Sequence, residues 1–258
     1  RQMCIRDSVH TVAGGYMTGA IFVMAISAYY MLRRQDLQFA RSSFRLAAVF
    51  GMIATLMTIQ MGDESGYLVT KDQPTKIAAM EAIWETHEAP APLTLFAIPD
   101  EAAQTNHAQI DVPWLFGLMG TRSLSTEIPG IKELTAQAEQ RIVNGQKAIG
   151  VLEQLRKDPA NEQLREQFLA VRDDLGFGLL LKRYTNDVNA ATPEMIKQAA
   201  ADTIPSVTPM FWSFRIMVGS GLAMALVFVL GLFYSFRNEI AEKAWYLRLA
   251  VLALPLPW

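Results

Sequence analysis

Three long apolar runs constrain this chain more than any other feature, because each approaches the length that a helix needs to cross a lipid bilayer. Val9 to Leu32 carries no charged residue, Leu46 to Met61 is similarly apolar but slightly short, and Met210 to Phe236 contains a single charge. A fourth apolar run begins near Ala244 and continues to Trp258. Hydrophobic residues make up 51% of the chain and charged residues 19%, so the apolar residues are concentrated in blocks. The pattern predicts an all-α fold, a polytopic membrane helix bundle.

The runs divide the chain into segments. We expect 9–61 to hold two transmembrane helices, 62–208 to form a large extracytoplasmic and mainly helical loop, 209–236 to form a third transmembrane helix, and 244–258 to begin a further, truncated one. Residues 1–8 contain three charges and the only cysteine, Cys4, and do not resemble a secretory signal peptide. We interpret them as a leader that is foreign to the native protein, and we expect no role for Cys4.

Charges in the short connections predict how the helices are oriented. The connection from Arg33 to Arg45 holds four arginines against one aspartate, and the connection from Arg237 to Arg248 holds three Lys/Arg against two glutamates. Both should therefore face the cytoplasm. The segment from Asp63 to Thr208 then lies outside, with 13 Lys/Arg against 21 Asp/Glu. This acidic balance argues against nucleic acid as a partner.

The exterior segment is too long to be an unstructured loop. Apolar residues recur at helical spacing in Gly130 to Lys157 and again in Asn161 to Tyr184, which predicts two helices. Thr192 followed by Pro193 predicts the start of a third short helix, ending before Pro205. Four prolines among small and apolar residues predict that Ala89 to Trp114 is an irregular strap.

Two residues in the membrane runs are candidate metal ligands. His10 is the only histidine in or beside a membrane run, and Met217 lies in the third run about 200 residues later. A histidine at a membrane edge is often an interfacial hydrogen-bonding residue, and a methionine in an apolar helix is often packing filler. Arg215 favours the interpretation that both residues are haem ligands, because a cation within the membrane needs a counter-charge, and a haem propionate would supply one. Otherwise the Arg215 side chain would extend to the membrane interface. Together the residues suggest an imidazole and a thioether that share one haem iron.

A second group of polar residues follows the second run. Gly62 to Tyr67 reads GDESGY, which in isolation predicts a solvated turn. Pro74 then predicts the start of a helix that carries Lys76 and Glu81, whose side chains leave an ideal helix about 140° apart. A site that oxidises a quinol needs a hydrogen-bond partner for one ring oxygen and a carboxylate that accepts the released proton. Lys76 and Glu81 meet both needs.

Six motifs carry a resemblance to a known family. They are VHTVAGGY (9–16), GDESGY (62–67), KIAAMEAIWET (76–86), GLLLKRYT (178–185), FRIMV (214–218) and PLPW (255–258). In sequence and separation they resemble subunit I of the cytochrome bd-type quinol oxidases, over nearly everything from Val9 onward. The segment from about 128 to 203 resembles the long-loop class of that family.

The resemblance implies a role for each candidate residue. The histidine of the VHTV-like motif and the methionine of the FRIM motif are the axial ligands of a low-spin haem b in that family, which implies His10 and Met217, with Arg215 beside the haem. The lysine and glutamate of the family's KxxxxE pattern act in quinol oxidation, which implies Lys76 and Glu81. The implied protein is a quinol:oxygen oxidoreductase subunit of a bacterial respiratory chain.

The resemblance also implies cofactors and partners beyond these 258 residues. A further haem b and a haem d belong to spans that this chain lacks, so they are expected only in the complete subunit. The implied partners are quinol, membrane lipid, a second large subunit and a small single-span subunit. The implied location is the bacterial inner membrane, with the quinol loop on the periplasmic side.

Two other functions fit part of the pattern. A non-catalytic membrane receptor with a helical extracytoplasmic sensing domain explains the spans and the charge asymmetry, but gives no reason for Arg215 beside Met217. A bc-type cytochrome normally uses paired histidines on two helices, and this chain has one histidine in a span.

Overall fold

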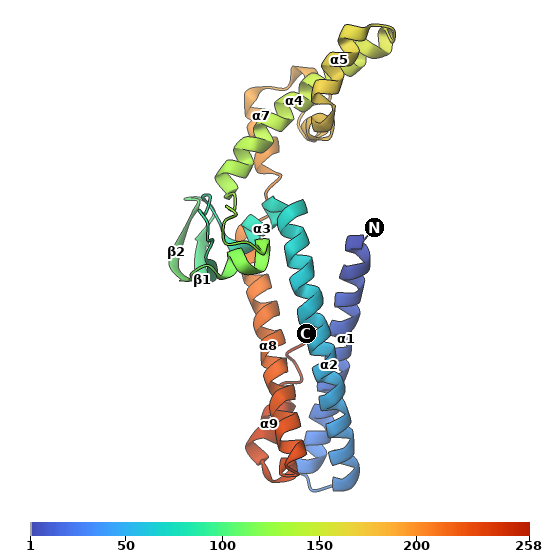
Figure 1. The fold of residues 1–258 in the computed structure, drawn as a ribbon, viewed down its shortest axis with the longest axis vertical. Coiled ribbons are helices and arrows are strands. Elements are labelled where there is room, and N and C mark those ends of the chain that lie inside the picture. Colours follow the sequence, from blue (N-terminus) through green and yellow to red (C-terminus); the bar gives the residue numbers. More distant parts are fainter. Residues whose placement is uncertain (1) are drawn as a thin grey trace. The chain divides into compact units, whose positions relative to one another are not determined.

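The computed structural model describes residues 2–258, apart from the side chains of residues 2–4, 6 and 7 (Figure 1). Its chain divides into two compact units. We call Arg1–Leu68 with Trp212–Trp258 the spanning unit, and Val69–Phe211 the loop unit. The prediction for Cys4, and most of the predicted leader, fall outside the described side chains.

The spanning unit is built from α1 (Gln2–Leu32), α2 (Leu37–Asp72), α8 (Val207–Phe236) and the short α9 (Ala244–Leu252). Three of these helices, α1, α2 and α8, are long and apolar enough to cross a membrane. They lie side by side, and a 3-10 turn, η5 (Ile240–Glu242), precedes α9 (Figure 1). The predicted helical membrane bundle is confirmed for the described part of the chain.

The buried core of the spanning unit lies in the half of the bundle that carries the α1–α2 and α8–α9 connections. Its largest fully buried side chains are Phe44, Phe228 and Tyr246. Two glycines allow this packing, because a Cβ at Gly51 would lie 2.1 Å from the Phe228 ring and one at Gly231 would lie 2.6 Å from the Tyr246 hydroxyl oxygen. Close helix contacts of this kind are typical of membrane bundles.

Two polar contacts close the same end of the spanning unit. The Tyr246 hydroxyl donates a hydrogen bond of 2.6 Å to the Val227 carbonyl, which satisfies a buried polar group. Arg45, near the start of α2, donates to the Ser235 carbonyl at 2.8 Å and to the Asn238 side chain at 3.0 Å. The first part of α2 is therefore fixed to the end of α8.

The loop unit contains short helices and a two-stranded sheet. Its elements, in chain order, are α3 (Pro74–Glu81), β1 (Leu93–Asp100), β2 (Thr105–Val112), the π-helix η1 (Gly117–Thr121), α4 (Ile131–Lys157), α5 (Glu162–Val171), η2 (Arg172–Asp174), α6 (Leu175–Gly178), η3 (Leu179–Arg183), η4 (Val188–Ala190) and α7 (Pro193–Ala201). The predictions of helices beginning at Pro74 and at Pro193, and of a helix up to Lys157, are confirmed. Thr192 caps α7, because its hydroxyl accepts a hydrogen bond from the Met195 amide.

The prediction of an irregular strap was wrong. Residues 93–112 form an antiparallel hairpin, in which Leu93 pairs with Val112 and Asp100 with Thr105. Its prolines flank the strands or lie near their ends, where a missing amide proton costs no central ladder bond. The Asp100 carboxylate accepts hydrogen bonds from the amides of Ala102 and Ala103, which shapes the connection between the strands.

Two helix boundaries also differ from expectation. The GDESGY motif is helical, because α2 continues to Asp72 instead of ending in a turn. The predicted helix from 161 to 184 is broken into α5, η2, α6 and η3. The segment after the break packs its backbone against α4, where a Cβ at Gly145 would lie 2.3 Å from both the Asp174 carbonyl oxygen and the Gly178 amide nitrogen. Such backbone contact requires α6 to turn against α4.

Candidate functional site

His10 lies on α1 with its ring against the backbone of α2. A Cβ on Gly62 would come within 3.3 Å of the His10 Cε1 atom. Any residue other than glycine at position 62 would therefore force the His10 ring to shift. The imidazole is half-buried, and its Nδ1 atom is buried without a hydrogen-bond partner among the described residues. A buried nitrogen of this kind is unusual in a purely structural histidine.

Met217 lies on α8 with 54% of its surface exposed, which argues against a role as core filler. At 1.5 Å per residue, His10 is about 33 Å along α1 from its end at Leu32, and Met217 is about 28 Å along α8 from its end at Phe236. Both helices end at the face where the connections lie. His10 and Met217 are therefore at a similar level of the spanning unit, on the same side.

Glycines lie one helical turn from each of these positions. Gly14 follows His10 by four residues, Gly66 follows Gly62, and Gly221 follows Met217. A Cβ on any of the three glycines would have nothing within 4 Å. The faces of α1 and α8 that carry His10 and Met217, and the face of α2 that carries Gly62, thus expose smooth backbone, which a flat ring can approach closely.

The residue types fit a haem. Neutral imidazole and thioether groups are an established axial pair for haem iron. Within the described part of the chain, no group of three or more His, Cys, Asp or Glu side chains is arranged to hold a metal ion. His10 and Met217 remain the ligand pair that the sequence suggests.

Arg215 is half-buried on α8, two residues before Met217. Its guanidinium carbon lies 5.6 Å from the centre of the Phe214 ring, within the range of a cation–π contact. A positive charge at this level of a spanning helix suits an anionic group such as a propionate.

Lys76 and Glu81 occupy α3 in the loop unit. Pro74 is in the first turn of that helix, where its lack of an amide proton costs nothing. Lys76 is exposed, whereas Glu81 is 3% exposed. Because the two residues are five positions apart, their side chains leave the helix about 140° apart. They therefore do not form a surface ion pair along the helix.

The end of α3 is held by residues that sequence reasoning missed. Ala82 has a left-handed backbone with φ of 51°, and its carbonyl accepts a hydrogen bond of 2.9 Å from the Asn106 amide. The Trp84 indole nitrogen donates to the Asn106 side-chain oxygen at 2.8 Å. Asn106 thus fixes the backbone immediately after Glu81. No local signal in the sequence points to it, because it lies on β2, 24 residues from Ala82.

The segment after α3 is also fixed to the start of α4. The Ile131 amide donates to the Ile83 carbonyl at 2.8 Å, and a Cβ on Gly130 would lie 2.4 Å from the Glu85 carbonyl carbon. Lys132 forms an ion pair of 2.7 Å with Glu85, and its hydrogen bond lowers the pKa of the Glu85 carboxyl. Glu81 therefore sits next to a closely fixed backbone.

His87 lies at the end of the segment that follows α3. It forms a two-way backbone bridge with Ile128, and its Nδ1 atom is buried without a hydrogen-bond partner in the described chain. Burial lowers the pKa of His87 below its ordinary value of 6.5, against a smaller raising effect of the Asp111 charge. His87 is therefore neutral at pH 7.

The chain is similar in sequence and in fold to known proteins. The chain is 41% identical over 250 residues to the cytochrome bd-II ubiquinol oxidase subunit 1 of Escherichia coli, covering 97% of this chain and 49% of that protein. It is 26% identical over 249 residues to the cytochrome bd ubiquinol oxidase subunit 1 of Bacillus subtilis, covering 96% of this chain and 41% of that protein. The chain thus spans about half the length or less of these relatives.

A solved structure, bd oxidase from Geobacillus thermodenitrificans, has a similar fold, with a TM-score of 0.64 and 19% sequence identity. The match covers 98% of this chain and 43% of that chain. Residues 1–258 also match the family described as cytochrome bd terminal oxidase subunit I, over the whole sequence. The chain therefore belongs to the cytochrome bd terminal oxidase subunit I family.

Proposed function

We propose that this chain is the part of a bacterial quinol oxidase that binds quinol and holds a low-spin haem b. The observation that carries the proposal is the position of His10 and Met217 at a similar level on two spanning helices, with open glycine faces one turn away. Membership in the bd oxidase family supports the same reaction class.

His10 and Met217 are the proposed axial ligands, and Arg215 is the proposed partner of a propionate. If these residues hold a haem b, the haem would supply a one-electron acceptor suited to electron relay. Gly62 keeps the His10 ring against α2 and so sets the direction of its free nitrogen. The His10 imidazole would bind the iron through one ring nitrogen, and the tautomer would decide which nitrogen is free to do so.

Glu81 and Lys76 are the proposed quinol-site residues. The Glu81 carboxylate accepts a proton from one quinol hydroxyl, and the Lys76 ammonium donates a hydrogen bond to the other ring oxygen. Oxidation of one quinol releases two electrons and two protons. The electrons would pass one at a time to the haem and onward, and Glu81 would pass its first proton to solvent before it accepts the second. The hydrogen bonds of Asn106 and Trp84 keep the backbone beside Glu81 in place during this exchange.

The remaining parts of the proposal concern the complete protein. As the family resemblance implies, the complete protein reduces oxygen with electrons from quinol and works with a second large subunit and a small single-span subunit. The further haem b and haem d lie outside these 258 residues. The arginine-rich connections support a periplasmic position of the loop unit at the bacterial inner membrane, because such connections usually face the cytoplasm.

Difference spectra test the ligand pair. Reduced-minus-oxidised spectra of membranes that express the full-length gene should show a low-spin b-type band, which His10→Ala and Met217→Ala should each abolish. Met57→Leu is the matched control, because Met57 is also an exposed methionine of a spanning helix. An unchanged band in both alanine variants would refute the ligand assignment and favour the receptor function.

A further inference from the structure

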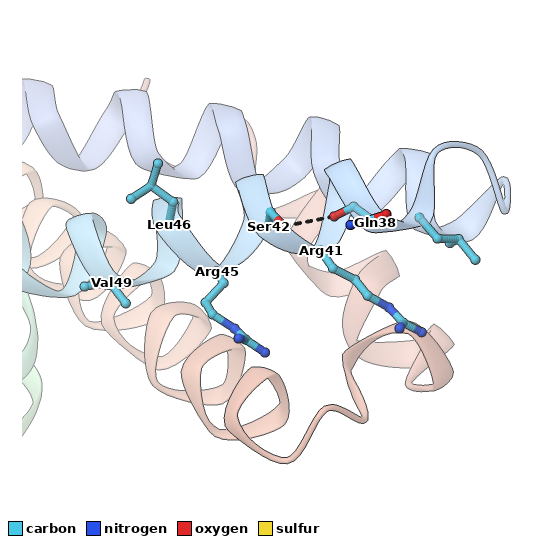
Figure 2. Close-up of a pocket in the computed structure, with 7 residues that line it drawn as sticks. Gln38, Arg41, Ser42, Arg45, Leu46 and Val49 are labelled. Carbon is cyan, nitrogen blue, oxygen red and sulfur yellow. Dashed lines mark hydrogen bonds between the residues drawn. The ribbon is translucent and has the colours of Figure 1, made fainter.

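A surface pocket lies at the start of α2, far along that helix from the Gly62 contact with His10. Its volume is about 720 Å³, and it is lined by Leu37, Gln38, Arg41, Ser42, Arg45, Leu46 and Val49 (Figure 2). Figure 2 shows the Arg41 and Arg45 side chains leaving α2 toward the same side. Residues four apart on a helix have Cβ atoms about 5–6 Å apart, so the two guanidinium groups can reach one anion.

The two arginines retain capacity for an anion. The two hydrogen bonds of Arg45, to Ser235 and Asn238, both use Nη2, whereas a guanidinium has five N–H donors. Those bonds hold Arg45 in place. Arg41 makes no hydrogen bond or ion pair with the part of the chain that the structure describes. The pocket therefore presents one fixed cation and one available cation.

The charge around the pocket has the same sign. The two connections at this end of the spanning unit, 33–45 and 237–248, contain seven Lys/Arg against three Asp/Glu. Two of the three acids are on the second connection, where Glu239 is already paired with Arg237 and Lys243. The pocket is therefore a place where a negative charge is stabilised.

Beyond the arginines, α2 presents an apolar and exposed stripe. Leu46 is 73% exposed, and further exposed apolar residues follow at helical spacing, namely Val49, Ile53 and Leu56. From Leu46 to Leu56 the helix rises about 15 Å, which equals half of the roughly 30 Å hydrocarbon core of a bilayer. The stripe thus has the length of the acyl chains of one membrane leaflet.

We propose that Arg41 and Arg45 bind the phosphate of an anionic phospholipid whose acyl chains lie along the Leu46–Leu56 stripe. Arg forms bidentate hydrogen bonds with phosphate oxygens, and basic pockets at the cytoplasmic ends of membrane helices suit anionic head groups. An apolar helix of a partner would cover the stripe but would leave the two arginine charges without a complement. Arg41 and Arg45 lie near the start of α2, far along that helix from Gly62, so lipid binding there is independent of haem or quinol binding.

Lipid retention tests the proposal. The complete oxidase, reconstituted in nanodiscs of equimolar phosphatidylglycerol and phosphatidylcholine, is transferred to detergent, and the bound lipids are counted by native mass spectrometry. We expect selective retention of phosphatidylglycerol, and an approximately five-fold weaker retention in Arg41→Gln. This single variant keeps the Arg45 bonds to α8 and so should not alter the fold. Arg41→Gln with Arg45→Gln should lose the selectivity.

The matched control is the double variant Arg33→Gln with Arg34→Gln. It removes the same charge from the same connection, but neither residue lines the pocket. It should retain phosphatidylglycerol as the wild type does. Equal loss of phosphatidylglycerol retention in both double variants would show that retention depends only on the total positive charge of the connection, and would overturn the proposal. Unchanged retention in Arg41→Gln would also overturn it, and would indicate that another protein segment covers this face.

Discussion

At the scale of single residues, the contact between His10 and Gly62 can be tested with one methyl group. Gly62→Ala places a Cβ 3.3 Å from the His10 Cε1 atom, so the ring must shift by a few tenths of an ångström. If His10 is the proposed axial ligand, its new ring orientation should shift the wavelength of the low-spin haem band without abolishing it, and should change the midpoint potential. Spectroelectrochemistry of the complete oxidase measures both.

Gly19→Ala is the control for this prediction. Gly19 lies on α1 nine residues after His10, about 180° around the helix, and a Cβ there would meet nothing within 4 Å. It should leave the band and the potential unchanged. Identical spectra for Gly62→Ala and the wild type would mean that the His10 ring does not bind the iron.

Glu81 is the buried carboxylate that we propose accepts the quinol proton. Glu81→Gln keeps the size of the side chain but removes the proton acceptor, so quinol oxidation should slow by about a hundred-fold or more. The haem spectrum should stay intact. Steady-state turnover with a soluble quinol measures the effect. Glu85→Gln is the control, because Glu85 is an exposed carboxylate on the same segment; equal turnover in both variants would remove Glu81 from the site.

The residues of the candidate site differ in how far the sequence alone predicts them. The helix signal at Pro74 predicts that Lys76 and Glu81 lie on a short helix, which α3 confirms, whereas their role in quinol oxidation is implied only by the family resemblance and stays a prediction. The structure adds that Glu81 is buried and Lys76 exposed. Asn106 could not be predicted, because its contacts with Ala82 and Trp84 are made by a strand distant in sequence. Whether His10 and Met217 share an iron stays a prediction.

At the scale of elements, local signals predicted the helices well and tertiary contacts decided the rest. α4 and α7 follow from apolar spacing and from the Thr192 cap, both of which are local. The hairpin depends on cross-strand pairing between β1 and β2, which the proline content of the segment does not indicate. The break after α5 depends on α4, whose Arg141 bonds to Asp174 at 2.7 Å and stacks on Phe177.

The crossing of α4 and α6 gives a prediction at this scale. In Gly145→Ala the new methyl group would lie 2.3 Å from the Asp174 carbonyl oxygen, and backbone atoms cannot move aside cheaply. We expect a loss of about 1–3 kcal/mol in the local stability of the loop unit. Faster limited proteolysis between 158 and 190 in the complete oxidase would report it. Gly176→Ala is the control, since a Cβ there is unobstructed; equal cleavage rates in both variants would contradict the prediction.

At the scale of the whole molecule, stability should depend on pH through His87. Its folded pKa is lowered by burial, so the unfolded chain binds a proton more readily and acid favours unfolding. Stability should be greatest above the ordinary pKa of 6.5 and should fall as pH drops from there through the lower folded value. Thermal unfolding between about pH 8 and about pH 5 measures this slope.

His87→Gln should flatten the slope in that range, because the bridge to Ile128 uses backbone atoms that the variant keeps. The carboxyls of Glu85 and Asp174 also have lowered pKa values, through hydrogen bonds with Lys132 and Arg141. The contributions of these two carboxyls to folding stability are lost only in more acidic solution, below the ordinary carboxyl pKa of about 4. If thermal stability in His87→Gln still depended on pH near pH 6 as in the wild type, another group would be responsible for that dependence.

The uneven packing of the spanning unit has a consequence for how such a subunit is assembled. Phe44, Phe228 and Tyr246 join the helices near their connections, while Gly14 and Gly221 leave the opposite half smooth. The helices can therefore associate at one end without any prosthetic group. Insertion of the chain and loading of the proposed haem would then be separable events, the second in a bundle whose topology is already decided.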